Sequence, residues 1–396
     1  MFARGDSYQS SFQVSEGEWL AMLVTKTRRA LTAVAGTMAL LGATTAAADY
    51  ALNLTPGVTP ISHEAHTLHM LVLKVCFGIA IVVFGAMFIS IIKHRKSRGV
   101  TPAQFHESTA VEIVWTIVPF LILVGMAIPA TKALVAMEDT SNADLSIKVT
   151  GYQWRWHYDY MDNGVSFFST LSTPKDQIYN KAAKDEHYLL EVDNPVVVPV
   201  NKKVRLLITS SDVIHAWWVP QLGMKKDAIP GYINEMWFKV EKAGTYRGQC
   251  AELCGKDHGF MPIVVVAKSD ADYQQWVAQQ QGAAAADEQA AQRTWSKDEL
   301  MARGEKVYGS TCAACHQANG EGVPGAFPAL KGSAIATGPL ADHLSLVMHG
   351  KPGTAMAAFA DQLSDTDLAS VVTYERNSWG NDTGDMVQPS DVKAAR

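Results

Sequence analysis

Two long apolar runs constrain this chain more than any other feature, because in a lipid bilayer only a helix or a closed barrel satisfies its own backbone. Residues 71–92 are apolar except for Lys74, and residues 113–130 carry no charge. Both runs are close to the roughly 20 residues that a membrane-spanning helix needs. The basic segment 93–98 directly follows the first run and should stay in the cytoplasm. The sequence therefore predicts a transmembrane helical hairpin over residues 60–138, with everything after residue 135 outside.

The first 48 residues have the pattern of an N-terminal extension followed by a secretory signal peptide. Basic residues 26–29 precede an apolar, alanine-rich stretch over 30–43 and the small residues 46–48, after which we expect cleavage. The alternative is a short membrane anchor, but the apolar stretch is too short for a full span. Since the polar residues 1–21 precede the signal, Met22 is a candidate translation start.

Four potential metal ligands lie in one short segment, at Cys250, Cys254, His258 and Met261. Soft sulfur ligands select copper, whereas structural zinc sites usually take four Cys or His ligands. A mononuclear blue copper site needs one Cys, so the second thiolate suggests two bridged copper ions. Such a centre needs another imidazole, which His215 could supply. The alternative is a disulfide between the two cysteines.

These residues, together with segments 212–217 and 223–231, resemble the CuA domain of cytochrome c oxidase subunit II. The resemblance covers residues 60–268. It implies a binuclear copper centre whose ligands are His215, Cys250, Cys254, His258, Met261 and the backbone carbonyl of Glu252. It also implies that the Glu252 carboxylate serves a Mg²⁺ site shared with subunit I, because hard cations prefer carboxylate oxygens.

The resemblance implies roles for two further residues. Trp154, in the aromatic segment 151–160, would be the point where electrons from cytochrome c reach the copper. The same aromatic pattern is also typical of a strand that packs one face on a core. Glu112, at the cytoplasmic mouth of the second span, would mark the entrance of a proton channel into subunit I. The alternative is that Glu112 is an interfacial carboxylate, solvated by water or acting as a charge at the helix N-terminus.

Residues 140–268 have the pattern of an all-β sandwich, and the resemblance implies that it is cupredoxin-like. Runs of β-branched or aromatic residues are separated by turn signals, and they cover residues 146–150, 196–198, 204–208, 236–240 and 263–266. The Cys-to-Met loop should lie between the last two strands. Residues 269–293 should follow as a helix and linker, with the helix over 272–278 and the alanine-rich stretch 281–291 as the linker.

The segment Cys312-Ala-Ala-Cys315-His316 has the CxxCH signature of covalent heme c attachment, with His316 as the proximal iron ligand. A CxxC redox pair is the alternative. Helix-like stretches over 297–308 and 365–374 flank the motif, and this order resembles an all-α class I cytochrome c domain over residues 294–390. The resemblance implies that Met356 is the distal iron ligand, although Ala357 follows it where the family often has Pro. The alternative distal ligands are Met348 and His349.

Two of the five cysteines lie in each motif, and we expect the fifth, Cys76, to be a buried packing residue. A net charge of −5 gives no indication of nucleic-acid binding. The resemblances together imply subunit II of a heme-copper oxidase in a bacterial inner membrane, with its copper and cytochrome c domains in the periplasm.

The implied partners are subunit I with its hemes and CuB, subunit III, the lipid membrane and a periplasmic electron donor such as a cytochrome c. In this role the chain would pass electrons from heme c through CuA to heme a of subunit I. Subunit I would reduce oxygen to water and pump protons. The main alternative is a membrane-anchored copper chaperone for oxidase assembly, which would have a thioredoxin-like fold. A quinol oxidase subunit is a third possibility, but its sandwich typically lacks the copper ligands.

Overall fold

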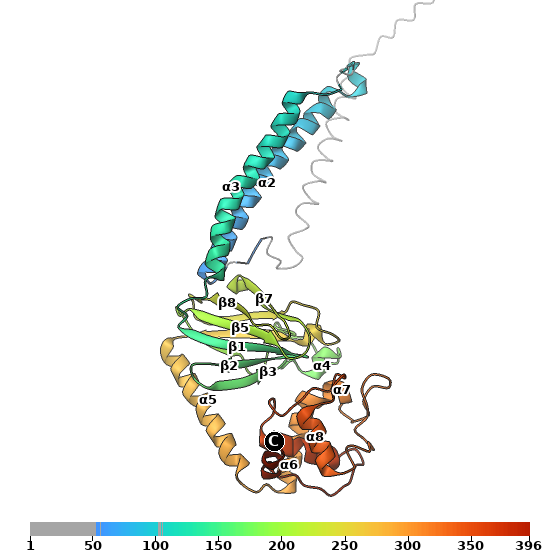
Figure 1. The fold of residues 1–396 in the computed structure, drawn as a ribbon. Coiled ribbons are helices and arrows are strands. Elements are labelled where there is room, and N and C mark those ends of the chain that lie inside the picture. The colour runs from blue at the N-terminus through green and yellow to red at the C-terminus, as the bar shows by residue number, and fades with distance from the viewer. Residues whose placement is uncertain (1–52, 56, 102–103, 105) are drawn as a thin grey trace, which may run out of the picture. The chain divides into compact units, whose positions relative to one another are not determined.

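The computed structural model describes residues 53–55, 57–101, 104 and 106–396, so the predicted signal peptide over residues 1–48 lies outside the described part. Helices α2 (Pro60–Lys93) and α3 (Thr109–Glu138) run antiparallel and are joined by a segment that contains the short helix η2 (Lys96–Arg98) (Figure 1). Both are long and apolar enough to cross a membrane. Helix α2 spans about 50 Å, since each residue adds about 1.5 Å.

The start of α2 is fixed by a capping box. The Thr59 side chain accepts a hydrogen bond from the Ser62 backbone, the Ser62 side chain pairs with the Thr59 backbone, and Pro60 occupies the first turn. The Thr59 hydroxyl also donates to the carbonyl of Leu222 at 2.8 Å, which joins the helix to the following domain. Cys76 is exposed on α2, so its prediction as a buried residue was wrong. A spanning helix turns such side chains toward lipid or a partner rather than into its own core.

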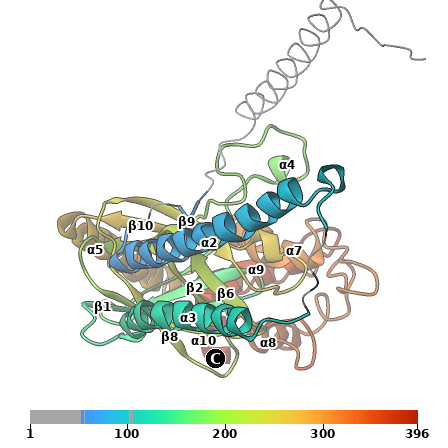
Figure 2. The ribbon, with the colours of Figure 1, turned by 90° about the horizontal axis from the view of Figure 1, so that it is seen from above.

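Residues 145–268 form two five-stranded sheets that enclose one hydrophobic core. The first sheet has the order β3-β2-β1-β5-β8 and the second the order β4-β10-β9-β6-β7. In chain order the strands are β1 (Leu145–Tyr152), β2 (Arg155–Tyr160), β3 (Val165–Ser169), β4 (Val196–Pro199), β5 (Val204–Ser210), β6 (His215–Val219), β7 (Met224–Ala228), β8 (Asn234–Phe238), β9 (Gly244–Cys250) and β10 (Pro262–Lys268). Figure 2 shows this sandwich from the side of α2 and α3.

The sequence pattern found five of these strands and missed β3, β6, β7 and β9, although the all-β sandwich itself is confirmed. Strand β7 was missed because it carries Lys225, Lys226 and Asp227, and β9 because it contains Gly244 and Gly248. Strand β2 does alternate between buried and half-buried residues, as expected for a strand with one face on the core. The short helices α4 (Lys175–Ile178), η3 (Pro220–Leu222) and η4 (His258–Phe260) lie in the loops.

Helix α5 (Asp270–Ala291) continues through the stretch predicted to be a linker. This prediction was wrong because alanine and glutamine are strong helix formers, and Asp287 and Ala290 also contact the cytochrome domain. Ser269 caps the helix by accepting a hydrogen bond from the backbone N–H of Asp272. In the first half of the helix, the side chains of Tyr273 and Val277 are buried.

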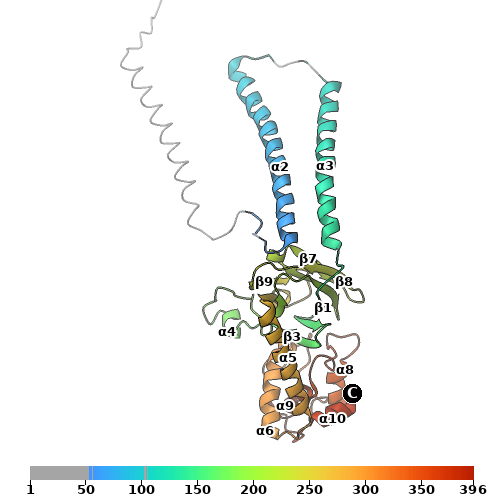
Figure 3. The ribbon, with the colours of Figure 1, turned by 90° about the vertical axis from the view of Figure 1, so that its left-hand side faces the viewer.

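The C-terminal part of the described chain is helical, as predicted. It contains α6 (Lys297–Val307), the π-turn η5 (Tyr308–Cys312), α7 (Ala313–His316), α8 (Leu340–His349), α9 (Asp365–Arg376) and α10 (Pro389–Ala395). Helices α6 and α9 pack side by side around buried leucines and valines (Figure 3). A Cβ on Gly304 would lie 2.1 Å from the carbonyl oxygen of Ser370, so only glycine permits this close approach. Residues 55–396 together form one compact unit.

Candidate metal and heme sites

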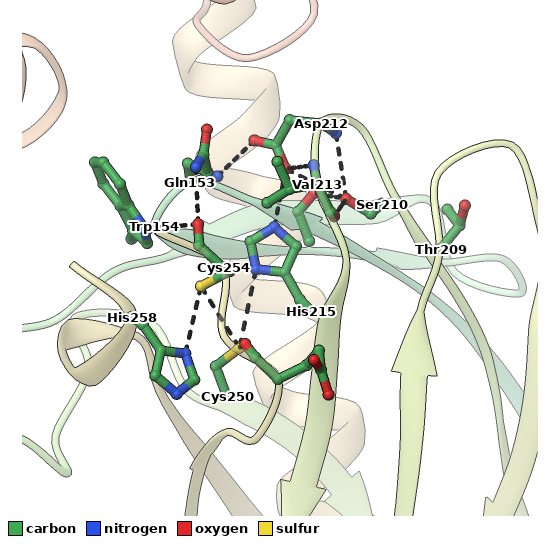
Figure 4. Close-up of polar contacts among 12 residues, drawn as sticks. Gln153, Trp154, Thr209, Ser210, Asp212, Val213, His215, Cys250, Cys254 and His258 are labelled. Carbon is green, nitrogen blue, oxygen red and sulfur yellow. Dashed lines mark hydrogen bonds and ion pairs between the residues drawn. The ribbon is translucent and has the colours of Figure 1, made fainter. Parts of the chain in front are cut away.

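The sandwich brings the predicted copper ligands together at one end (Figure 4). His215 opens β6 and Cys250 closes β9, while Cys254 and His258 come from the loop between β9 and β10. The Sγ atom of Cys250 lies 3.9 Å from Nδ1 of His215 and 3.8 Å from Sγ of Cys254. The Sγ atom of Cys254 lies 3.5 Å from Nδ1 of His258. Two sulfurs and two imidazoles therefore face one small volume.

The sulfur separation excludes a disulfide in this structure, because a bonded pair would be about 2.0 Å apart. Both cysteines are free thiols and both are buried. The three ligand atoms of His215, Cys250 and Cys254 lie within 4.8 Å of one another, so one metal ion could contact them all. A soft donor set of this kind fits copper.

The two remaining predicted ligands belong to the same loop. The backbone N–H of Cys250 donates to the carbonyl of Met261 at 3.0 Å, which holds the two ends of the loop together. The Met261 side chain is 1% exposed. The carbonyl oxygen of Glu252 lies 3.3 Å from Sγ of Cys250, and the residue itself is exposed to solvent. The loop therefore directs the Glu252 carbonyl inward and leaves its carboxylate accessible.

Asp212 orients His215, a role that sequence analysis missed. Its Oδ1 lies 2.9 Å from Nε2 of His215, so Nε2 carries the proton and Nδ1 remains free to bind a metal. Burial lowers the pKa of His215, but its hydrogen bonds to Asp212 and Cys250 raise that pKa overall. A Cβ on Gly151 would lie 2.7 Å from the imidazole, so this glycine makes room for it. The available sequence signal was an Asp three residues before a candidate His ligand.

The pKa values of the two thiols are shifted in opposite directions. The pKa of Cys250 is lowered to about 3, chiefly by the hydrogen bond from the Cys254 thiol. The pKa of Cys254 is raised, chiefly because it shares its proton with the neighbouring Cys250. A metal ion that replaced this proton would bind two thiolates.

Gln153 and Trp154, which directly precede strand β2, contact the loop that carries the predicted copper ligands. Gln153 Nε2 and Trp154 Nε1 donate to the carbonyl oxygen of Cys254 at 2.8 and 3.3 Å. Gly255 permits this contact, since its φ is +118° and a Cβ there would lie 2.8 Å from Gln153 Nε2. The indole of Trp154 is therefore one hydrogen bond away from a residue of the cluster. Sequence analysis singled out Trp154 but not Gln153.

A second site surrounds the CxxCH segment, where a cavity of about 560 Å³ is lined by Cys312, Cys315 and His316. Its volume is typical of a pocket for a cofactor. His316 Nδ1 lies 2.8 Å from the carbonyl oxygen of Pro328, which leaves Nε2 free to bind iron. These residues fit a covalently attached heme with one imidazole ligand.

The structure separates the three candidates for the distal iron ligand. Met356 lines the cavity. Met348 is 0% exposed within the helical core, and His349 is exposed on α8; neither lines the cavity. The arrangement supports Met356.

Glu112 lies in the first turn of α3 and is exposed. The Thr116 hydroxyl donates to its backbone carbonyl at 2.8 Å. Nothing in this geometry tests the proton-channel role, which stays a prediction.

Fold and sites together define a membrane-anchored redox protein, with a cupredoxin-like metal domain and a fused heme domain. Three family models match the chain. Cytochrome C oxidase subunit II, periplasmic domain, covers residues 145–268; the transmembrane domain of the same subunit covers 47–133; and cytochrome C oxidase, cbb3-type, subunit III covers 299–374.

Similar proteins are named as subunit 2 of cytochrome c oxidase. The probable cytochrome c oxidase subunit 2 of Rickettsia bellii is 43% identical over 58% of this chain and 84% of its own length. Cytochrome c oxidase subunit 2 of Cereibacter sphaeroides is 36% identical over 57% of this chain and 79% of its own length. A solved periplasmic domain of subunit II from Bradyrhizobium japonicum is 46% identical, covers 36% of this chain and 97% of its own, and superposes with a TM-score of 0.33.

The chain therefore belongs to the cytochrome c oxidase subunit II family and carries an additional C-terminal cytochrome c domain. Its family implies copper in the sandwich and heme in the helical domain. The oxidase complex to which such subunits belong is a cytochrome-c oxidase. The chain has two membrane-spanning helices and a periplasmic domain.

Proposed function

We propose that this subunit accepts electrons at heme c and passes them through a binuclear CuA centre to heme a of subunit I, which reduces oxygen to water and pumps protons. The observation that carries the proposal is the pair of free thiols 3.8 Å apart, each with an imidazole nitrogen within 3.9 Å. These two thiolates would hold copper, which soft sulfur ligands select. The proposed ligands are His215, Cys250, Cys254, His258, Met261 and the carbonyl of Glu252.

Trp154 is the proposed connection between the two sites. Its indole donates to Cys254, and the residue also lines the cavity that contains Cys312 and Cys315. One side chain therefore contacts both the cluster loop and the heme cavity. This placement supports a route from heme to copper that needs no diffusive encounter, because the donor is covalently tethered.

Three finer roles complete the proposal. The exposed Glu252 carboxylate would bind Mg²⁺ jointly with subunit I. Glu112 would mark the entrance of the proton channel, and Met356 would be the distal ligand of heme c. We further propose that the subunit lies in a bacterial inner membrane, beside subunits I and III.

Metal analysis and electron paramagnetic resonance of the purified protein test the copper proposal. We expect two copper ions per chain and one unpaired electron delocalised over both. One copper ion, or zinc in its place, would contradict the binuclear centre. A single colourless Cu(I) would favour the copper chaperone instead, although the family matches and the β-sandwich argue against it.

A further inference from the structure

Arg155 follows Trp154 in the chain and reaches from the sandwich to the cytochrome domain. Its Nη2 donates to Oε1 of Gln362, which lies in the loop just before α9. Its guanidinium carbon lies 4.3 Å from the ring centre of Phe168 on β3 and 5.9 Å from that of Phe359. One cation therefore interacts with both domains of the same compact unit.

The electrostatics of Arg155 are unusual for this sandwich. Burial lowers its pKa to about 10, so the side chain is still charged at neutral pH. It forms no ion pair with any described residue, whereas Arg205 pairs with Glu235 and Arg247 with Glu191. A desolvated guanidinium is costly unless other groups compensate it. Here the compensating groups are the Gln362 amide oxygen and the rings of Phe168 in the sandwich and Phe359 in the cytochrome domain.

The neighbours of Arg155 explain why this contact matters. Trp156 points to the opposite face of β2, where it is buried and stacks edge-on against His215 at 5.8 Å. Trp154, Arg155, Phe359 and Gln362 all line the cavity that contains the heme-attachment cysteines. A displacement of the cytochrome domain at Arg155 would therefore also change the distance between Trp154 and the heme-attachment cysteines.

We propose that Arg155 is a positioning residue. It holds the cytochrome domain against the side of the sandwich that carries Trp154. The proposal rests on the electron route proposed above. It adds the residue that keeps heme c and the copper centre at a fixed distance. Without it, α5 and α6 would still tether the cytochrome domain, but only a fraction of molecules would be docked at any time.

The test compares electron transfer from heme c to CuA in the complete purified oxidase, followed by rapid-mixing or flash spectroscopy. Arg155→Gln removes the charge and is expected to slow this step about tenfold, the effect of losing one charge-assisted hydrogen bond. Covalent heme attachment and the CuA resonance should both be retained, because Arg155 is not a predicted ligand of either cofactor. The matched control is Arg205→Gln, which breaks an ion pair inside the sandwich and should leave the rate unchanged.

Variants of the partner residue make the test specific. Gln362→Ala should slow transfer by a similar factor, and the double variant should be no slower than either single variant, since both remove the same contact. Gln362→Glu would create an ion pair with Arg155 and should match or exceed the rate of the unmodified protein. Arg155→Lys should rescue only partly, because lysine lacks the planar fork.

The outcomes separate the two proposals. If Arg155→Gln and Gln362→Ala both transfer electrons at the original rate, the seating role is wrong while the electron route stands. If the unmodified protein passes no electrons from heme c to copper, the proposed function itself is wrong. Should Arg155→Gln fail to assemble, Gln362→Ala alone decides the question, because Gln362 is only half-buried.

Discussion

Asp212 shows how a residue outside the ligand set can control the metal site. Its carboxylate accepts hydrogen bonds from the backbone of Val213 at 2.6 Å and of Gln153 at 2.7 Å, as well as facing His215. Burial raises its pKa, but these hydrogen bonds lower that pKa overall, so the group is ionised at neutral pH. An ionised Asp212 fixes the imidazole with Nδ1 toward the sulfurs.

Asp212→Asn is expected to weaken copper binding by about 10–100-fold, the usual effect of losing a partner that orients a histidine ligand. Copper affinity can be measured by competition with a chelator. Asp159→Asn is the matched control, because Asp159 also faces a histidine, His157, at 3.3 Å but does not contact the cluster. Equal affinities of Asp212→Asn and the unmodified protein would contradict the orienting role.

The loop between β9 and β10 depends on glycine at one position. Gly255→Ala should destabilise the protein by about 1–3 kcal/mol, because its positive φ is strained for alanine and the new Cβ would meet Gln153. It should also displace Trp154 and slow electron transfer to copper. Thermal unfolding and rapid kinetics measure the two effects.

Gly259→Ala is the control for this prediction. Gly259 lies in the same loop, has no positive φ, and a Cβ there would meet no atom within 4 Å. If both substitutions had the same effect, the loss would reflect the loop in general rather than the close approach of Gln153.

The first turn of α6 should give the cytochrome domain a stability that depends on pH. Glu299 accepts from the Ser296 backbone, from Arg293 and from the Ser296 hydroxyl, which lowers its pKa from 4.5 to about 2. A group with a lowered folded-state pKa stabilises the fold above pH 4.5, and this stabilisation is lost as the pH falls toward 2.

Glu299→Gln should therefore lower the melting temperature at neutral pH and make no difference near pH 2. Melting curves across this range, followed by circular dichroism, measure the effect. Glu305→Gln on the same helix is the control, since Glu305 takes no part in the capping box. A deficit that persisted unchanged to low pH would rule out ionised Glu299 as its source.

At the scale of the whole molecule, the two cofactor sites should be separable. Replacing both Cys312 and Cys315 by alanine should abolish covalent heme attachment while leaving the copper resonance intact, since the cluster shares no ligand with the CxxCH segment. Oxygen consumption from the natural donor should then fall to background. Heme staining of denaturing gels, resonance spectra and an oxygen electrode measure the three effects.

Cys76→Ala is the matched control, because this cysteine is exposed on α2 and belongs to neither site. It should retain heme, copper and oxygen consumption. Undiminished oxygen consumption in the double variant would mean that electrons reach copper without heme c, which contradicts the proposed route.

The sequence by itself determined the spanning helices, the fold classes of the domains and the candidate ligands. These features were accessible because hydrophobic periodicity and ligand spacing are local. Cys250, Cys254 and His258 share one loop, and the heme cysteines share one turn. Local patterns failed for two elements whose composition is unusual for their structure. One is the polar strand β7, and the other is helix α5, which continues through alanine-rich residues of which none is fully buried.

Only the tertiary structure decided which distant residues meet. Hydrogen bonds join Asp212 to His215, Trp154 to Cys254, and Arg155 to Gln362. Met356 lines the heme cavity, whereas Met348 does not. Arg155 and Gln362 are 207 positions apart in the chain. Such contacts depend on how sheets, loops and helices pack together, and no periodicity within one segment encodes that packing.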